Sequence, residues 1–269
     1  MSLRIQNNVE AFNAQRQLVN NSDKLGKAME KLSSGYRINR AGDDAAGLAI
    51  SEKLRGQIGG LAQAGRNAQD AVSLVQTAEG ALNEVHAMLQ RVRELAVQYK
   101  NGTLSSQDRT AIQSEVDQLK AEIERIGTDT EFNSIKLLNS ASTTVSFQVG
   151  AADAQQITVA TISIGAQVAQ HVYALNAGGT TDIADIDTAI NNVSAARAVF
   201  GAVQNRLEHT ISNLAAYQEN LTASESRIRD ADMASEMVQF TKLQILQQAG
   251  TSMLAQANQA PQGVLTLLR

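Results

Sequence analysis

An unbroken heptad of apolar residues between positions 61 and 99 is the feature that most restricts how this chain can fold. Two heptad positions are apolar at every repeat: Leu61, Ala68, Val75, Leu82, Leu89 and Ala96, and, three residues after each, Ala64, Ala71, Ala78, Val85, Val92 and Tyr99. A repeat of this length is typical of a long helix that packs along a partner helix. We therefore expect one helix from Asp43 or Asp44 to about Lys100.

The composition also favours long helices. The 269 residues include one proline, Pro261, and no cysteine or tryptophan, and aromatic residues make up only 3% of the chain. Few residues can therefore interrupt a helix, and the chain offers no disulfide, zinc-thiolate site or thiol nucleophile. The three histidines are far apart in sequence and form no HExxH motif, which disfavours a zinc hydrolase. We expect no catalytic residue, no cofactor and no metal.

Two further helices are predicted beyond the first. After the turn Asn101-Gly102, Ser105 can cap a helix that ends at Gly127. A second seam of period seven predicts a long helix that begins between Thr181 and Asp187 and has these apolar residues: Val193, Phe200, Leu207, Leu214, Leu221 and Ile228. A calcium site is disfavoured at its start, where Asp182, Asp185 and Asp187 lack the glycine and distal glutamate of an EF-hand loop. These aspartates suit the positive end of a helix dipole.

The remaining central segment predicts a β-hairpin. Apolar and polar residues alternate with period two over 144–149 and 156–162, and a glycine-containing turn separates the two runs. The segment 163–181 contains three glycines and is expected to be a short surface connection.

Both ends of the chain predict amphipathic helices. Ala11, Leu18, Leu25 and Leu32 recur every seven residues near the start, and an apolar stripe follows Met233 near the end. Neither stripe adjoins a globular segment that could cover it. We therefore expect these helices to pack on each other or on other copies of the chain.

The charge pattern bears on partners and export. Residues 1–40 carry seven Lys or Arg against three acidic residues, whereas residues 101–190 carry eleven acidic residues against four basic ones. The basic residues alternate with apolar ones and lack stacking aromatics, so we expect no nucleic-acid partner.

No stretch reaches the roughly 18 apolar residues of a membrane span, and the amino terminus has no apolar signal core. If the protein is exported, it uses another route.

Seven blocks of the sequence closely resemble bacterial flagellin. Three lie in the first half of the chain: LSSGYRINRAGDDAAGLAIS (32–51), NAQD (67–70) and LQRVRELAVQ (89–98). Four lie near the carboxy terminus: QNRLE (204–208), SRIRDADM (226–233), QILQQAG (244–250) and AQANQ (255–259). The resemblance covers about residues 1–160 and 185–269. Only 163–184 remain where many flagellins insert variable outer domains, so the resemblance implies a minimal flagellin.

The resemblance implies a mainly α fold: a long antiparallel helical bundle or coiled coil with a small β-hairpin, whose terminal helices pair in the assembled filament. Residues 1–42 and 231–269 would form the inner filament core, and residues 43–230 a rod-like bundle with its hairpin near 144–162. The implied function is that of a secreted, extracellular subunit that polymerises into the flagellar filament for swimming motility. A hook-filament junction adaptor is the alternative. An enzyme-bearing flagellin is disfavoured, because the insert is too short.

The implied partners are other copies of the chain, a secretion chaperone on the last helix, and filament cap and hook-junction proteins. Polymerisation would depend on apolar residues of the terminal helices: Ile5, Phe12, Leu18, Leu25, Leu32, Met237, Phe240, Leu243, Leu246 and Leu254.

Two further sets of residues acquire roles from the resemblance. Arg37, Arg40, Asp43 and Asp44 would form the joint between the inner and outer layers; a phosphate loop is disfavoured there because no GxxxxGK[ST] pattern occurs. A second set matches the surface that an animal toll-like receptor recognises on many flagellins, although the same residues could form a lateral packing face: Gln90, Arg91, Leu95 and Glu115.

Overall fold

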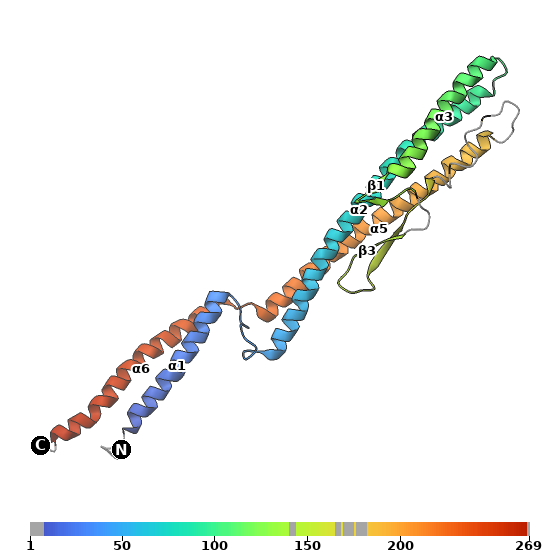
Figure 1. Ribbon diagram of the computed structural model, residues 1–269. Helices are drawn as coiled ribbons and strands as arrows, with labels where there is room; N and C mark the ends of the chain where they lie inside the picture. The colour runs from blue at the N-terminus through green and yellow to red at the C-terminus, as the bar shows by residue number, and fades with distance from the viewer. Residues whose placement is uncertain (1–7, 140–143, 165–167, 169–174, 176–181, 268–269) are drawn as a thin grey trace. The chain divides into compact units, whose positions relative to one another are not determined.

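The computed structural model describes residues 8–139, 144–164, 168, 175 and 182–267, the last eight of these by their backbone alone (Figure 1). The chain forms two compact units. We call residues 1–56 with 220–269 the terminal unit, and residues 57–219 the central unit. The described helices are α1 (Val9–Ser34), α2 (Ala45–Tyr99), α3 (Ser106–Asp129), α5 (Asp182–Arg229) and α6 (Met233–Leu267). The mainly helical prediction is therefore confirmed.

The core of the central unit follows the α2 heptad. Eleven of the twelve seam residues from Leu61 to Ala96 are buried, and Tyr99 packs against the same core. Apolar residues of α3 and α5 complete this core, among them Val116, Ile123, Phe200 and Leu207. Ion pairs fix the antiparallel direction of α5 along α2: Arg93 lies 2.6 Å from Asp187, and Arg197 lies 3.8 Å from Glu79.

Local hydrogen bonds cap α3 at its start. The Ser105 hydroxyl accepts the Asp108 backbone N–H at 3.2 Å, and the Asp108 carboxylate accepts the Ser105 N–H at 3.0 Å, which completes a capping box. The expected end at Gly127 was wrong, because α3 continues to Asp129. Gly127 is buried inside the helix, and a Cβ added there would meet Ile164 at 3.6 Å, an ordinary van der Waals contact.

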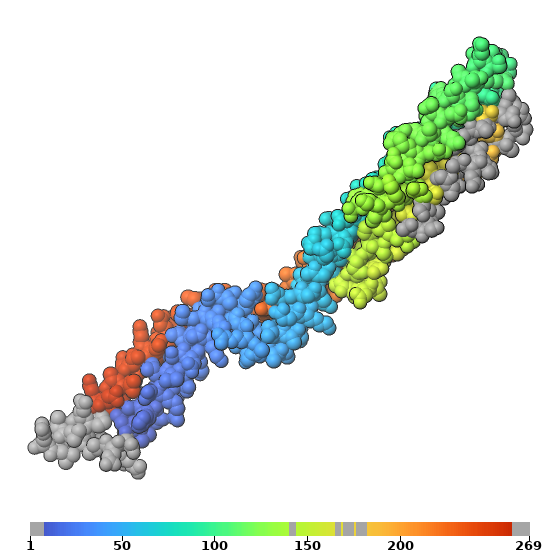
Figure 2. Space-filling view, viewed as in Figure 1, coloured from blue at the N-terminus to red at the C-terminus, as the bar shows by residue number. Residues whose placement is uncertain are grey.

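Two small antiparallel strand pairs complete the central unit. The expected hairpin is present as β3 (Thr144–Gln148) and β4 (Gln156–Ala160), in a register that pairs Ser146 with Thr158. The shorter pair, β1 (Glu131–Phe132) and β2 (Ile135–Lys136), was not predicted from the sequence. In Figure 2, α3 (green) and the strand segments that follow it (yellow-green) succeed one another along this unit.

The expectation for 163–181 was wrong for three of its residues. Ile164, Val168 and Leu175 are buried in the central core, so the segment contributes to packing. Most of its other residues lie outside the described part. In the described residues, no set of three or more His, Asp or Glu side chains could hold a metal ion. No helix of the described chain is both long enough and apolar enough to span a membrane.

Candidate assembly interface on the terminal helices

The terminal unit contains an antiparallel pair formed by α1 and α6 (Figure 1). Three contacts fix its register. The Asn8 side chain donates to the Ala257 carbonyl at 2.7 Å, and the Asn21 side chain donates to the Leu243 carbonyl at 2.8 Å. Between them, Leu18 lies so close to Gly250 that an added Cβ would be 3.2 Å from Leu18 Cδ1.

Half-buried residues on the two helices recur at heptad spacing and form the seam of the pair. On α1 they are Ala11, Ala14, Leu18, Asn21, Leu25 and Leu32, with Ala28 fully buried among them. On α6 they are Glu236, Phe240, Leu243, Gln247, Gly250, Leu254 and Ala257. Small residues such as Ala14, Ala28 and Gly250 allow close approach but bury little apolar area. The pair is therefore a thin two-helix layer and has no core of its own.

Many large apolar side chains on these helices remain exposed. On α1 they are Val9, Phe12, Val19 and Met29, and on α6 they are Met233, Met237, Val238, Ile245, Leu246 and Met253. Val238 is 70% exposed. Part of this face is hollowed into a depression of about 520 Å³ that is bordered by Met237, Val238, Ile245 and Leu246. An apolar surface of this kind marks an interaction site.

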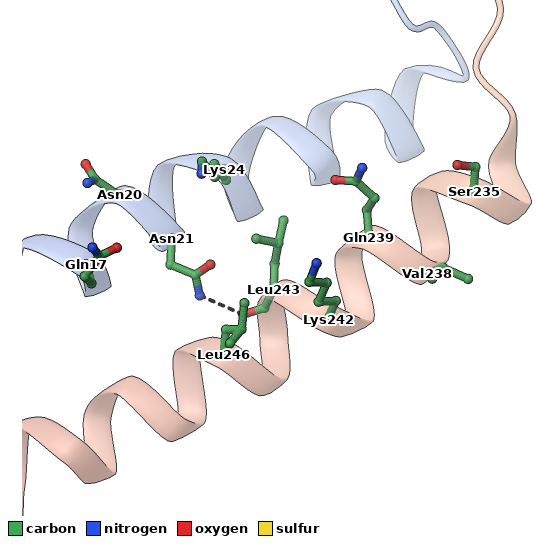
Figure 3. A pocket seen from close by; sticks show the side chains of 10 residues that line it. All are labelled: Gln17, Asn20, Asn21, Lys24, Ser235, Val238, Gln239, Lys242, Leu243 and Leu246. Carbon is green, nitrogen blue, oxygen red and sulfur yellow. Dashed lines mark hydrogen bonds between the residues drawn. The ribbon is translucent and has the colours of Figure 1, made fainter. Parts of the chain in front are cut away.

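A second, more polar groove of about 720 Å³ lies between the helices (Figure 3). Gln17, Asn20, Asn21 and Lys24 line it from α1, and six residues line it from α6: Ser235, Val238, Gln239, Lys242, Leu243 and Leu246. Leu243 points toward α1 in Figure 3, where its carbonyl accepts the Asn21 hydrogen bond. This groove adjoins the apolar depression, because Val238, Lys242 and Leu246 border both.

The predicted polymerisation residues divide into two groups in this geometry. Six lie half-buried in the seam: Leu18, Leu25, Leu32, Phe240, Leu243 and Leu254. Three are exposed: Phe12, Met237 and Leu246. Ile5 lies outside the described residues.

The two connections that break the helices are bonded to each other within the terminal unit. Gly35 ends α1 with a φ of 75°, a left-handed conformation that favours glycine. Its carbonyl then accepts the Ala231 N–H at 2.9 Å, and the Arg37 N–H donates to the Arg229 carbonyl at 2.7 Å. The segment after α1 is thereby tied to the segment between α5 and α6.

The predicted joint residues each bond to groups of this unit. Arg40 pairs with Glu30 at 2.8 Å, and the Arg37 guanidinium donates to the Ile228 carbonyl. The Asp43 carboxylate accepts the backbone N–H groups of Arg40 and Asn39, and these hydrogen bonds lower the pKa of Asp43.

The fourth joint residue has a capping role. Asp44 accepts the Gly47 N–H at 2.8 Å and caps α2. The sequence had left Asp43 and Asp44 as alternatives for this cap.

A cluster beside these residues was not predicted from the sequence. The Arg229 guanidinium lies 2.7 Å from the Glu52 carboxylate and 4.9 Å from the centre of the Tyr36 ring. The hydrogen bond from Arg229 lowers the pKa of Glu52. Both partners lie far from Arg229 in sequence. Tyr36 belongs to the block 32–51 and Arg229 to the block 226–233, but neither block indicated that the two residues meet.

In the central unit, three of the four predicted receptor residues are exposed. Arg91 pairs with Glu115 at 2.9 Å, and the pKa of its guanidinium is raised mainly by that hydrogen bond. Gln90 bonds the ring of His86 at 3.0 Å. Leu95 differs, because only 1% of its surface is exposed and it belongs to the core.

Comparison with known proteins identifies the family. The family model for the bacterial flagellin N-terminal helical region matches residues 5–143, and the family model for the C-terminal helical region matches residues 183–268. The chain belongs to the bacterial flagellin family. It is 56% identical to a flagellin of Halalkalibacterium halodurans, with 98% of this chain and 99% of the relative aligned. It is 52% identical to a flagellin of Bacillus subtilis, with 99% of this chain and 100% of the relative aligned.

A solved flagellin has a related fold. The crystal structure of Bacillus cereus flagellin is 34% identical to this chain, covers 55% of it and 88% of the solved chain, and gives a TM-score of 0.52. This flagellin is therefore a structural subunit that polymerises into the bacterial flagellar filament, an extracellular structure used for swimming. The alternative of a hook-filament junction adaptor is not favoured, because the matched family and these relatives are flagellins.

Proposed function

We propose that copies of this flagellin pack on one another through the exposed apolar faces of α1 and α6. The supporting observation is the distribution of these side chains. Of the fifteen large apolar residues that are exposed in the described chain, ten lie on these two helices. Water contact with this surface is unfavourable, and a neighbouring copy would remove it. Repeated contacts between identical copies that do not close into a ring produce a helical filament.

The proposal also divides the chain between two filament layers. Residues 1–42 and 231–269 form the inner core, and residues 43–230 form the outer layer. The breaks between α1 and α2 and between α5 and α6 lie at these limits, which supports the division. Arg37, Arg40, Asp43 and Asp44 then act at the joint by holding the two connecting segments in one conformation.

Seeded polymerisation of single variants tests the packing surface. Val238→Asp places a charge on an exposed apolar residue, so the single subunit should keep its fold while polymer growth is lost. Leu254→Asp places the charge in the seam and should also block growth. Gln248→Asp adds the same charge at an exposed polar position of α6, and His86→Ala changes the central unit; both should polymerise.

Sedimentation measures the polymer, and circular dichroism measures the fold of the unassembled subunit. Leu254→Met supplies a volume-conserving control for the seam. If Val238→Asp and Leu254→Asp both polymerised like the parent, the packing surface would have to lie elsewhere.

A receptor role is proposed for the exposed part of the predicted surface. Gln90, Arg91 and Glu115 are accessible and held in place by hydrogen bonds, which supports contact with an animal toll-like receptor. Leu95 would support the surface from the core. Arg91→Ala should reduce the response of receptor-bearing cells while leaving filament growth intact, whereas an unchanged response would exclude Arg91 from the contact.

The remaining proposals concern export and partners. We infer a structural and non-catalytic role, together with export through a flagellum-specific secretion apparatus. The nearly uncharged α6 would be shielded by a secretion chaperone before assembly, because its apolar face is exposed. Filament cap and hook-junction proteins would contact the same terminal helices at the filament ends. Binding of purified chaperone to the parent and to Val238→Asp tests the chaperone contact.

A further inference from the structure

The methionines of this flagellin are concentrated on the terminal helices. The chain has six methionines and no cysteine or tryptophan, so methionine is the only sulfur-bearing residue present. Of the five methionines in the described residues, Met88 is half-buried against the central core. The other four, Met29, Met233, Met237 and Met253, are 46–62% exposed and all lie on α1 or α6.

We propose that these four side chains are oxidation-sensitive sites, and that their conversion to methionine sulfoxide by peroxide stops a free subunit from joining the filament. The inference rests on the proposed packing surface of α1 and α6. It adds a chemical modification site and a reason why assembly would depend on the redox environment.

The oxidation step is a two-electron oxygen transfer. A lone pair of the thioether sulfur attacks one oxygen of hydrogen peroxide, the O–O bond breaks and an S–O bond forms. The proton on the transferred oxygen moves to the departing hydroxide, which leaves as water. Sulfur is oxidised, peroxide is reduced, and the product is a polar, chiral sulfoxide.

The position of Met237 determines what its sulfoxide would do. Met237 borders the apolar depression together with Val238, Ile245 and Leu246. In a free subunit the sulfoxide oxygen remains hydrated, because the side chain is exposed, so the helix pair tolerates it. When a neighbouring copy covers the depression, that oxygen must lose its water without an assured hydrogen-bond donor, which disfavours packing.

The same geometry predicts protection after assembly. Once neighbouring copies cover α1 and α6, peroxide reaches these sulfur atoms less readily. The free subunit is therefore the sensitive form. Oxidation and assembly compete for the same surface.

The test exposes free subunit and preformed filament to the same hydrogen peroxide concentration. Tryptic peptides locate the oxidation: Met29 lies in 28–31, Met88 in 67–91, Met233 and Met237 together in 230–242, and Met253 in 243–269, and fragment ions distinguish Met233 from Met237. Mass spectrometry should find sulfoxide at the four exposed methionines sooner than at Met88 in the free subunit, and more slowly at all four in the filament. Seeded growth of the oxidised subunit should fall about tenfold or more.

Two variants and a repair step test whether oxidation of these four methionines causes the loss of growth. For each protein, growth after peroxide is divided by its own growth before peroxide. The variant with Met29, Met233, Met237 and Met253 all replaced by leucine should keep a ratio near one, whereas Met88→Leu should lose growth like the parent. Methionine sulfoxide reductase should restore growth of the oxidised parent.

Undiminished growth of a fully oxidised parent would overturn the proposal. An equal loss in the four-leucine variant would also overturn it, because the damage would then lie at another residue. The Val238→Asp experiment needs no peroxide and tests the packing surface separately. If Val238→Asp blocks growth but oxidation does not, the packing surface stands and only the proposal on the methionines fails.

Discussion

Arg229, at the end of α5, lies 2.7 Å from the carboxylate of Glu52 in the early part of α2. The same guanidinium lies over the Tyr36 ring, so one side chain joins three segments of the terminal unit. A planar guanidinium can pair with a carboxylate and stack on a ring at once, which a lysine ammonium cannot do in the same way. This contact leads to the first prediction.

Replacing Arg229 by Lys should loosen the two connecting segments without changing net charge. Amide hydrogen exchange should become faster at 35–37 and 229–231, where backbone hydrogen bonds join the segments. Arg227→Lys, at an exposed neighbouring position, should leave exchange unchanged. Equal protection in both variants would show that the Arg229 contacts do not hold the segments together.

The same ion pair predicts an acid dependence. Since the Arg229 hydrogen bond lowers the pKa of Glu52, its stabilising effect is complete above the ordinary glutamate pKa and disappears as the pH falls through the lowered value. Hydrogen exchange at 35–37, corrected for the intrinsic effect of pH, should therefore show protection falling in that acidic range. In Glu52→Gln this step should be absent, and a step that persists would have to come from another carboxylate.

Two glycines near the start of α2 should respond oppositely to alanine. At Gly47, a Cβ would clash with the Asp44 carboxylate that caps the helix and lie 2.8 Å from Ile38 Cδ1, so Gly47→Ala should destabilise this region. At Gly56, a Cβ meets no atom within 4 Å, and Gly56→Ala should stabilise the helix by up to about 1 kcal/mol. Local exchange protection measures both effects, and a shared sign would contradict the described packing.

The central core predicts a large cost for truncating the α2 seam. Leu82 is fully buried, so Leu82→Ala should lower the free energy of unfolding by about 2–5 kcal/mol. Val97→Ala, on the same helix but 52% exposed, should change it by less than about 0.5 kcal/mol. Urea unfolding followed by circular dichroism makes the comparison, and similar midpoints for the two variants would mean that the seam does not form the core.

The register of α1 and α6 can be tested through two adjacent asparagines. Asn21 bonds the Leu243 carbonyl, whereas Asn20 is exposed beside it. Replacing asparagine by alanine raises the helix propensity equally at the two positions. The difference in stability between Asn21→Ala and Asn20→Ala therefore isolates the hydrogen bond, which is worth about 1 kcal/mol. Protection of the α6 amides near Leu243 should fall further in Asn21→Ala.

The heptad periodicity predicted the long helices well, because the spacing of apolar residues along a helix determines which of its faces is buried. It underestimated the width of the buried stripe. Leu74 and Leu95 lie one residue before a seam position, yet both are buried, because α2 packs against α3 as well as α5. The prediction of Leu95 as part of an accessible surface could not anticipate this second partner.

Contacts between distant segments were the other gap. The resemblance grouped Arg37, Arg40, Asp43 and Asp44 as a joint, but it did not predict the partners of the two arginines, which are the Ile228 carbonyl for Arg37 and Glu30 for Arg40. The short β1–β2 pair was missed because two-residue strands carry no periodic signal. In the structure, Asn133 and Ser134 form its turn, and both have positive φ.

The arginine that covers Tyr36 in the terminal unit has a counterpart in the central unit, where the Arg109 guanidinium lies 5.7 Å from the centre of the Tyr99 ring. Because the chain has no tryptophan and only four tyrosines, these two rings contribute much of its near-ultraviolet optical signal. Tyr36→Phe and Tyr99→Phe would each remove the near-ultraviolet signal of one tyrosine. Difference spectra against the parent would then follow the melting of each unit separately, without an added dye or label.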